Sequence, residues 1–313
     1  MTRKGLKENE KKSGYFWELT NRLIKNAAKS QDYLFTFQTQ SNFDGKIGPF
    51  PHFIYTDHTH LVNLEYPEYL EENLNVKSWQ RKEKDFYKRS QGIFTMSNHV
   101  KNSLLNQYQI DPKKVKCVFA GANITQTDII YPLGRYQRKK ILFVGVDWER
   151  KGGPELIEAF KLVLKAHPEA QLDIVGCNPK IDVPNVKIWG KLPIKEVKKI
   201  YESASIFCMP SKREPFGIVY LEAMAYKLPI VALKIGALPD FVEEGKTGFL
   251  VNHREIKIMA DRLIQLLDQP TLAKEMGETS YKKVKEQYTW ENSVSEIKKF
   301  IDSLNIFKQT DYL

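Results

Sequence analysis

The 313-residue chain is poor in cysteine and has no long apolar run. Its three cysteines, Cys117, Cys177 and Cys208, are scattered without a CxxC pair. This pattern predicts buried, reduced thiols rather than a disulfide framework or a zinc site. No stretch approaches the ~20 apolar residues of a membrane-spanning helix. The start, residues 1–12, is polar and basic with no apolar segment behind it, so it does not resemble a secretory signal. We therefore expect a soluble, cytoplasmic protein.

Acidic residues are outnumbered by basic ones, and the formal net charge is +10 at pH 7. Such a balance favours anionic partners such as nucleic acid, acidic lipids or phosphorylated substrates, unless it only reflects a lysine-rich surface. The sequence contains no zinc finger, RNP motif or other nucleic-acid module. We therefore expect no nucleic-acid partner, and phosphorylated substrates or an anionic membrane remain.

From residue 139 onward, short and nearly continuous apolar runs alternate with amphipathic helical patterns. Runs of this kind are typical of strands buried on both faces of a parallel sheet. The predicted strands are 141–145, 171–176, 186–190, 205–209 and 229–233, and the helices between them include 154–166, 194–203 and 217–226. The alternation predicts a doubly wound α/β domain with its ligand at the carboxyl ends of the strands.

The first part of the chain is also α/β, with about four strands. We expect strands at 33–38, 52–56, 92–97 and 114–120, and helices at 13–29, 79–90 and 100–107. Residues 131–140 are polar and basic with Pro and Gly, which predicts a linker. The predicted domains are therefore 1–135 and 136–290, followed at 291–313 by a helix that returns toward the first domain.

The strongest local signal is the segment from Glu214 to Glu222. A predicted strand ends near Met209, a loop carries Glu214, and Gly217 opens a helix. The free N–H groups and the positive dipole end of such a helix form an anion site. Eight helical residues span ~12 Å, a spacing at which the two carboxylates can grip groups on either side of a diphosphate. Taken alone, the pair also fits surface acids that complement a helix dipole.

This segment resembles the GT-B retaining glycosyltransferases of family 4, the glycosyl transferases group 1 family. Their E-x7-E motif is matched by Glu214 and Glu222, and the agreement covers about residues 139–300. The other matching stretches are FVG at 143–145, RKG at 150–152, WG at 189–190, EAMA at 222–225, LPIV at 228–231, GALPDFV at 236–242 and GKTGFLV at 245–251. The resemblance implies a GT-B fold, in which two Rossmann-like domains face a cleft.

The resemblance also implies a role for each matching residue. Glu214 would hold hydroxyls of the transferred sugar, Glu222 would bind the ribose, and Lys151 would neutralise the diphosphate leaving group. A solvated lysine at a helix start is the alternative for Lys151. Residues near the base, sugar and diphosphate of the donor would be Gly145, Gly190, Lys191, Leu192, Phe216, Gly217 and Ile218.

Two departures from the family pattern stand out. Many relatives carry Arg after the glycine of the first donor-domain strand, where this chain has Val146. We expect Arg150 to supply the second charge on the phosphate. In addition, no strand, Gly-rich loop and helix precede Ser13, so the N-terminal domain is predicted to be shortened. This leaves acceptor binding, and activity of the chain alone, open.

In the first half, the segment Thr56-Asp-His-Thr-His60 follows an apolar strand. Polar groups at a strand tip are candidates for substrate contact. Family members often carry a His or Asp in this loop near donor sugar and acceptor, so we expect that role for Asp57 and His58. A hydrogen-bonded structural turn and an HxH metal site are the alternatives.

The expected function is a retaining transfer of a sugar from a UDP-, GDP- or ADP-sugar to an acceptor hydroxyl. The acceptor would be a sugar or a lipid-linked molecule in glycan, glycolipid or cell-surface polysaccharide synthesis. No DxD motif is present where a metal–diphosphate site belongs, so neither metal nor other cofactor is expected. The alternatives are another GT-B enzyme, such as a nucleotide-sugar 2-epimerase, and a nucleotide-sugar-binding remnant without activity.

The helix predicted at 13–29 carries Arg22, Lys25 and Lys29 on one face, with Phe16 and Trp17 on the same segment. A basic amphipathic helix with aromatic residues can lie on an anionic membrane. This would make the protein peripheral on the inner face of a membrane. Alternatively, the apolar side of the helix packs on the domain's own sheet and the basic side chains are only solvated.

Overall fold

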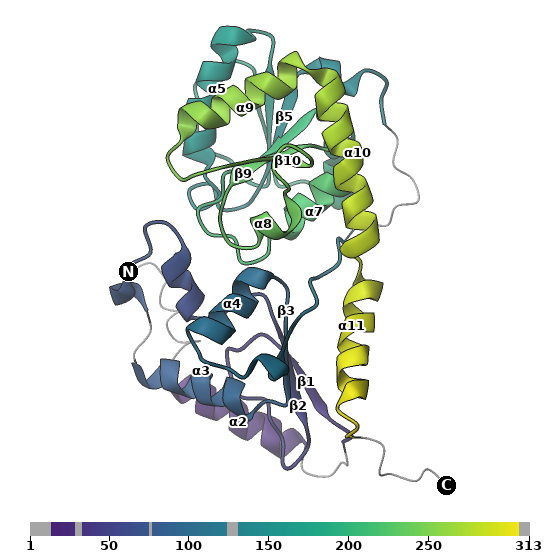
Figure 1. Ribbon diagram of the computed structural model, residues 1–313. Coiled ribbons are helices and arrows are strands. Elements are labelled where there is room, and N and C mark those ends of the chain that lie inside the picture. The colour runs from purple at the N-terminus through teal and green to yellow at the C-terminus, as the bar shows by residue number, and fades with distance from the viewer. Residues whose placement is uncertain (1–13, 29–32, 75–76, 124–130, 307–313) are drawn as a thin grey trace. The chain divides into compact units, whose positions relative to one another are not determined.

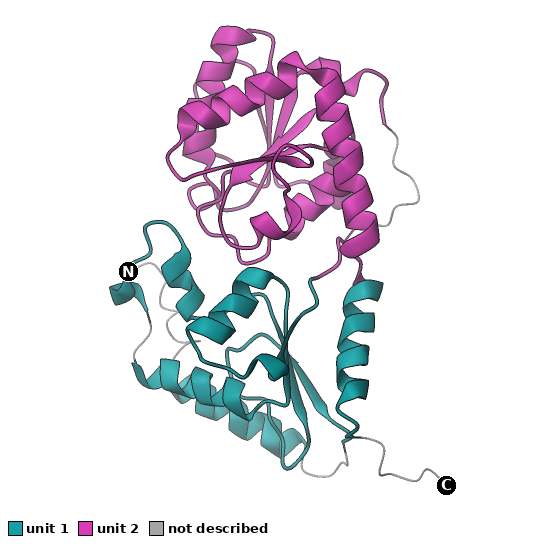
Figure 2. Cartoon of the chain, viewed as in Figure 1, with its two compact units in different colours: residues 1–119, 291–313 teal, residues 120–290 magenta. Residues whose placement is uncertain are grey.

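The computed structural model describes residues 14–28, 33–74, 77–123 and 131–306. The chain divides into two compact units, residues 1–119 with 291–313 and residues 120–290 (Figure 2). Both units are α/β, as the sequence predicts, and each contains one parallel sheet.

The second unit is built on a six-stranded sheet with the order β10-β9-β8-β5-β6-β7. Its strands are β5 (Lys140–Val144), β6 (Gln171–Val175), β7 (Val186–Gly190), β8 (Ile206–Cys208), β9 (Ile230–Leu233) and β10 (Gly248–Val251). Strands β6 and β7 extend the sheet on one side of β5, whereas β8, β9 and β10 extend it on the other. The strand order therefore reverses between β5 and β8. In doubly wound sheets this switch point is where ligands bind.

Helices cover this sheet because their apolar faces need burial. They are α5 (Gly153–Ala166), α6 (Ile194–Ser203), α7 (Ile218–Ala225), α8 (Leu238–Phe241), α9 (Ile256–Asp268) and α10 (Pro270–Gln287). Helix α5 lies beside α9, and α7 packs against α10 (Figure 1). In α5, Leu156, Phe160 and Val163 are fully buried, as the helical spacing of these residues predicts.

The predicted linker at 131–140 is instead packed into the second unit. Arg135 in the 3₁₀ turn η5 (Arg135–Arg138) is only 3% exposed. Its Nη2 donates to the carbonyl oxygens of Tyr226 at 2.8 Å and Lys227 at 2.7 Å. These carbonyls follow α7, so Arg135 satisfies acceptors that the end of a helix leaves open. The basic, Pro- and Gly-containing composition hides this helix-capping role.

The first unit has a four-stranded parallel sheet with the order β1-β2-β3-β4. Its strands are β1 (Thr36–Thr39), β2 (His52–Thr56), β3 (Gly92–Thr95) and β4 (Val115–Cys117). Its helices are α2 (Gly14–Ala27), α3 (Lys77–Arg89), α4 (Asn98–Asn106) and α11 (Trp290–Ser303), and its 3₁₀ turns are η1 (Leu61–Glu65), η2 (Glu71–Asn73) and η3 (Pro112–Lys114). Because α11 follows α10 directly in sequence, the chain leaves the second unit to complete the first.

Alternate residues of β2 and β3 supply two cores. On one face, Ile54 and Ile93 belong to a buried cluster that includes Trp17 from α2 and Trp79 from α3. The two indole rings meet edge to face, with centroids 6.0 Å apart, a favoured aromatic geometry. On the opposite side of the pleat, Phe94 meets Phe300 of α11 at 5.2 Å. Both faces of this sheet are therefore covered.

A buried carboxylate fixes the loop that follows β2. Glu83 of α3 is 1% exposed. Its Oε1 accepts hydrogen bonds from Ser41 Oγ at 3.3 Å, the His60 amide at 3.2 Å and Tyr87 OH at 3.1 Å. Its Oε2 accepts from Tyr108 OH. Burial raises the pKa of Glu83 to about 7 even though these donors favour the charged form. A buried charge persists only with such partners, and here they anchor the loop carrying His60.

Candidate functional site

Two loops of the second unit meet at the switch point between β5 and β8. The first, residues 145–152, follows β5, and the second, residues 209–217, follows β8. The Lys212 amide donates to the Arg150 carbonyl at 2.9 Å. Gly152 has φ of +75°, and a Cβ there would lie 1.9 Å from the Pro210 carbonyl oxygen. Only glycine therefore permits this approach of the two loops.

Lys151 and Glu214 form a buried ion pair across these two loops. Lys151 Nζ contacts Glu214 Oε2, and the residues are 9% and 5% exposed. The structure thus brings together two residues to which the sequence assigns different parts of one donor. A buried ammonium or carboxylate is costly unless it is paired. Each of these side chains therefore needs a partner of opposite charge or a ligand that replaces it.

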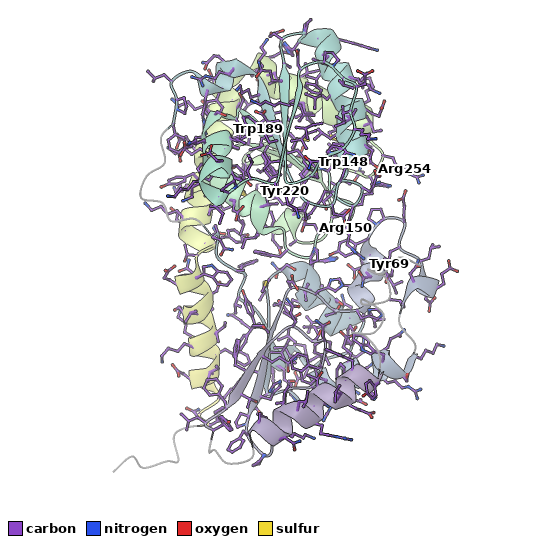
Figure 3. The ribbon with its side chains drawn as sticks, turned by 180° about the vertical axis from the view of Figure 1, so that it is seen from behind. Tyr69, Trp148, Arg150, Trp189, Tyr220 and Arg254 are labelled. Atoms are coloured by element: carbon purple, nitrogen blue, oxygen red, sulfur yellow. The ribbon has the colours of Figure 1, made fainter. Side chains whose placement is uncertain are left out.

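Arg150 braces the second loop. Its Nε lies 3.2 Å from Asp147 Oδ2, and its Nη1 donates to the Arg213 carbonyl at 2.8 Å. The residue before Glu214 is thereby held by the residue before Lys151. Figure 3 labels Arg150 with Trp148 of the same loop. Val146, the residue that replaces the family's Arg, is 69% exposed. The expected contact of Arg150 with a phosphate stays a prediction.

Helix α7 starts directly after Gly217. The N–H groups of a first helical turn have no partners within the helix, and the dipole makes this end positive. Phe216 is buried beside it, and Tyr220 OH donates to the Met209 carbonyl at 2.6 Å, which ties α7 to the end of β8. Glu222 lies on the same helix, and burial raises the pKa of its carboxyl to about 6.

Glycines stand at the tips of the three strands beside this site. The Gly145 amide donates to the Val175 carbonyl at 2.9 Å, and the Gly176 amide donates to the Gly190 carbonyl at 2.7 Å. Gly176 has φ of +100°, and a Cβ there would lie 2.7 Å from the Gly145 carbonyl oxygen. The strand ends therefore form a backbone floor without side chains. Beyond Gly190, Lys191 is exposed and Leu192 is half-buried.

Asp57 and His58 belong to the first unit, where they follow β2. Thr56 Oγ1 accepts from the His58 amide at 3.2 Å and donates to the His58 carbonyl at 2.7 Å. This is a hydrogen-bonded turn, one of the alternatives that the sequence left open, and both side chains remain half-buried. His60 instead packs against Trp79, with ring centroids 4.8 Å apart. The described residues contain no group of three metal-ligating side chains.

Sequence reasoning missed a second histidine at the neighbouring strand tip. His99 follows β3, directly after the helix cap Ser97, whose Oγ accepts from the Val100 amide at 3.2 Å. His99 Nδ1 lies 3.2 Å from Glu65 Oε2. Burial lowers the pKa of His99 to about 4 and raises the pKa of Glu65. The sequence signal was the position of His99 after the strand predicted at 92–97, the same position that His58 has after β2.

The sequence of the second unit matches a known family model. The model described as glycosyl transferases group 1 matches residues 129–283. A D-inositol 3-phosphate glycosyltransferase of Corynebacterium aurimucosum is 29% identical over 231 residues, which is 65% of this chain and 55% of that protein. A GDP-mannose-dependent phosphatidylinositol monomannoside mannosyltransferase of Corynebacterium glutamicum is 35% identical over 158 residues, 45% of this chain and 41% of that protein. The chain therefore spans about half the length of these relatives.

Solved structures resemble the chain over more of its length. The sucrose-phosphate synthase of Thermosynechococcus elongatus has a TM-score of 0.74 at 18% identity and covers 92% of this chain and 78% of its own. Anabaena HepE in complex with UDP and glucose has a TM-score of 0.68 at 16% identity and covers 93% of this chain and 82% of its own. At these identities the likeness concerns the fold, which is GT-B.

The matched segment contains the switch-point loops, the Lys151–Glu214 pair and helix α7, so the sequence match and the site coincide. From the family match in the second unit and the fold shared with both solved structures, we conclude that the chain belongs to the glycosyl transferases group 1 family.

Proposed function

We propose that the chain is a retaining glycosyltransferase of family 4 that transfers a sugar from a nucleotide-diphosphate sugar to an acceptor hydroxyl. The observation that carries this proposal is the buried Lys151–Glu214 pair at the switch point, beside the start of α7. A cation, a carboxylate and free backbone amides meet there. They match the three chemical features of such a donor: the diphosphate, the sugar hydroxyls and the charge that develops as the bond between them breaks.

In the proposed mechanism, the diphosphate contacts Lys151 and the first amides of α7. Negative charge grows on the departing phosphate, and preorganised cations and dipoles stabilise such charge most where water is excluded. The pocket side chains are nearly buried before any ligand enters. Arg150, which holds the Glu214 loop through the Arg213 carbonyl, would add a second positive charge nearby. No step of this scheme uses a metal ion or another cofactor.

The two carboxylates have different tasks in this proposal. Glu214, released from Lys151 as the diphosphate takes over the ammonium, accepts hydrogen bonds from hydroxyls of the transferred sugar. Glu222, further along α7, accepts the vicinal ribose hydroxyls, because an ionised carboxylate accepts without donating. The glycine tips at Gly145 and Gly190 leave room for a flat base next to Lys191 and Leu192. Holding the donor in this way supplies the positioning on which transfer depends.

On the acceptor side, Asp57 and His58 are proposed to contact the acceptor hydroxyl or the transferred sugar. Retention means that the acceptor attacks from the face that the diphosphate leaves. Some solved relatives support a nucleotide-sugar donor: HepE has been solved with UDP and glucose, and the teichoic-acid enzyme TarM of S. aureus with UDP and alpha-GlcNAc-glycerol. We propose a UDP-, GDP- or ADP-sugar as donor and a sugar or lipid-linked molecule as acceptor.

An anionic membrane is a proposed partner of the first unit. Helix α2 buries Trp17 but leaves Tyr15 at 76%, Leu19 at 38% and Leu23 at 59% exposure. These residues recur every four positions and so form one exposed row. Arg22 and Lys25 are exposed on the same helix, whereas Lys29 lies outside the described residues. None of the described helices combines the length and hydropathy that a bilayer span requires. We therefore propose peripheral contact through α2.

The first test separates leaving-group stabilisation from sugar holding. Lys151→Gln should lower kcat by about 10²–10³-fold, the loss typical of one preorganised charge-stabilising group. Glu214→Gln should lower turnover more than nucleoside diphosphate affinity. Transfer is followed by product analysis after the active donor has been found by thermal shift with UDP-, GDP- and ADP-sugars.

The matched control for this test is Lys161→Gln, because Lys161 forms an exposed ion pair with Glu158 on α5. Wild-type kinetics in the Lys151→Gln variant, with the fold intact by circular dichroism, would contradict the role of Lys151. A product in which the donor sugar is epimerised without any acceptor would identify a nucleotide-sugar epimerase instead. Donor binding with no conversion at all would identify a non-catalytic remnant.

The second test uses the raised pKa of Glu222. Only the ionised carboxylate accepts both ribose hydroxyls, so affinity for the nucleotide sugar should fall as the pH drops through about 6. The intact donor is used because its diphosphate lacks the phosphate ionisation near pH 6 of a terminal phosphate. Calorimetry should show this dependence in the wild-type protein and in the control Glu275→Gln. The Glu222→Gln variant should bind weakly at every pH, and a wild-type pH profile in that variant would disprove the assignment.

The third test concerns the membrane. Arg22→Glu with Lys25→Glu should weaken cosedimentation with phosphatidylglycerol vesicles by about tenfold or more, because each basic residue near an anionic surface contributes about 1 kcal/mol. The control is Lys282→Glu with Lys285→Glu, an exposed pair with the same spacing on α10. Binding should fade with salt and be absent with neutral vesicles. If the α2 and α10 variants behave alike, α2 is not the contact surface.

A further inference from the structure

The strand-tip histidine of the first unit sits in an arrangement that sets its ring orientation. Thr56 Oγ1 bonds both the amide and the carbonyl of His58 and so fixes its backbone. The His58 imidazole lies parallel to the ring of Tyr66, with centroids 6.4 Å apart and planes 10° apart. Tyr66 is 4% exposed. The turn therefore places His58, and the buried Tyr66 ring supplies the surface on which its imidazole lies.

Tyr66 is itself held from its other side. The ring centroid of His99 lies 5.5 Å from that of Tyr66, with the planes tilted by 54°. Glu65, the residue before Tyr66, pairs with His99 Nδ1 at 3.2 Å. The Tyr66 amide donates to the Asn63 carbonyl at 3.1 Å, which closes η1. His99 thus contacts both the Tyr66 ring and the side chain next to it in sequence, and connects η1 to the start of α4.

The contacts of His99 favour one neutral tautomer. The Glu65 carboxylate accepts hydrogen bonds only, so Nδ1 carries the proton. His99 Nε2 is buried and has no hydrogen-bond partner among the described residues, and an N–H at that position would lose its bond to water without replacement. The positive N-terminal end of α4 also disfavours an imidazolium. Consistently, burial lowers the pKa of His99 to about 4. Its ring is therefore neutral, with a defined direction set by Glu65.

We propose that Glu65, His99 and Tyr66 are positioning residues that fix the orientation of the His58 imidazole for its contact with the substrate. The proposal rests on the function proposed above, because that function gives His58 its task. None of the three positioning residues needs to touch the substrate. Glu65 orients His99, His99 and the Glu65 pair hold Tyr66, and Tyr66 supports the flat face of His58. A misplacement of about 1 Å in such a supporting layer can lower a rate by about 10²-fold.

Ring nitrogens report directly on this arrangement, so the first readout needs no enzyme activity. The full chain contains six histidines, and ¹⁵N-histidine labelling followed by long-range proton–nitrogen correlation gives each tautomer. His58→Gln and His99→Gln assign the two signals. We expect His99 as the neutral Nδ1–H tautomer. In Glu65→Gln, both the His99 and the His58 signals should shift, and Tyr66→Leu should move His58 further. Glu71→Gln, at an exposed glutamate of η2, should move neither.

The second readout is kinetic. In Glu65→Gln, kcat should fall by about tenfold or more while the affinity for nucleoside diphosphate, whose proposed residues lie in the other unit, stays at the wild-type value. Melting curves of the variants serve to exclude loss of the fold. If His99 shifts in Glu65→Gln while His58 keeps its wild-type signal and titration, the inference is overturned. A wild-type protein that transfers no sugar would contradict the proposed function instead, and the ring signals would still decide the positioning.

Discussion

The site depends on one buried ion pair, Lys151 with Glu214. Strand order creates the place for it, since β5 and β8 are neighbours at the point where the sheet reverses direction. The loops after these strands can approach only because residue 152 is glycine. Two opposite charges are then held almost without water, where neither is stable alone. A donor that carries both a diphosphate and hydroxyls can replace each partner of the pair with a ligand group.

The surroundings of the pair keep it in place and leave room beside it. Arg150 ties the loop of Glu214 to the loop of Lys151 through the Arg213 carbonyl. Tyr220 ties α7 to the end of β8. The adjoining strands end in Gly145, Gly176 and Gly190, so no side chains occupy the floor. Rigid charges beside an open backbone surface are what a site needs to hold a flat base and a charged diphosphate together.

Local patterns predicted much of this architecture. The apolar run at 52–56 and the helical spacing in 154–166 led to the correct elements because periodicity and burial are coupled along the chain. The pairing of Lys151 with Glu214 could not be derived from spacing, since it joins residues 63 positions apart. Arg135 read as part of a basic linker because its acceptors lie at the end of α7. Glu83 and His99 escaped notice for the same reason, as their partners come from other elements.

A structure of the chain with UDP bound tests the central claim most directly. The account predicts that the diphosphate lies at the start of α7, that Lys151 Nζ has left Glu214 for a phosphate oxygen, and that Glu222 contacts the ribose hydroxyls. UDP bound away from the switch point, with the Lys151–Glu214 pair still closed, would contradict the account.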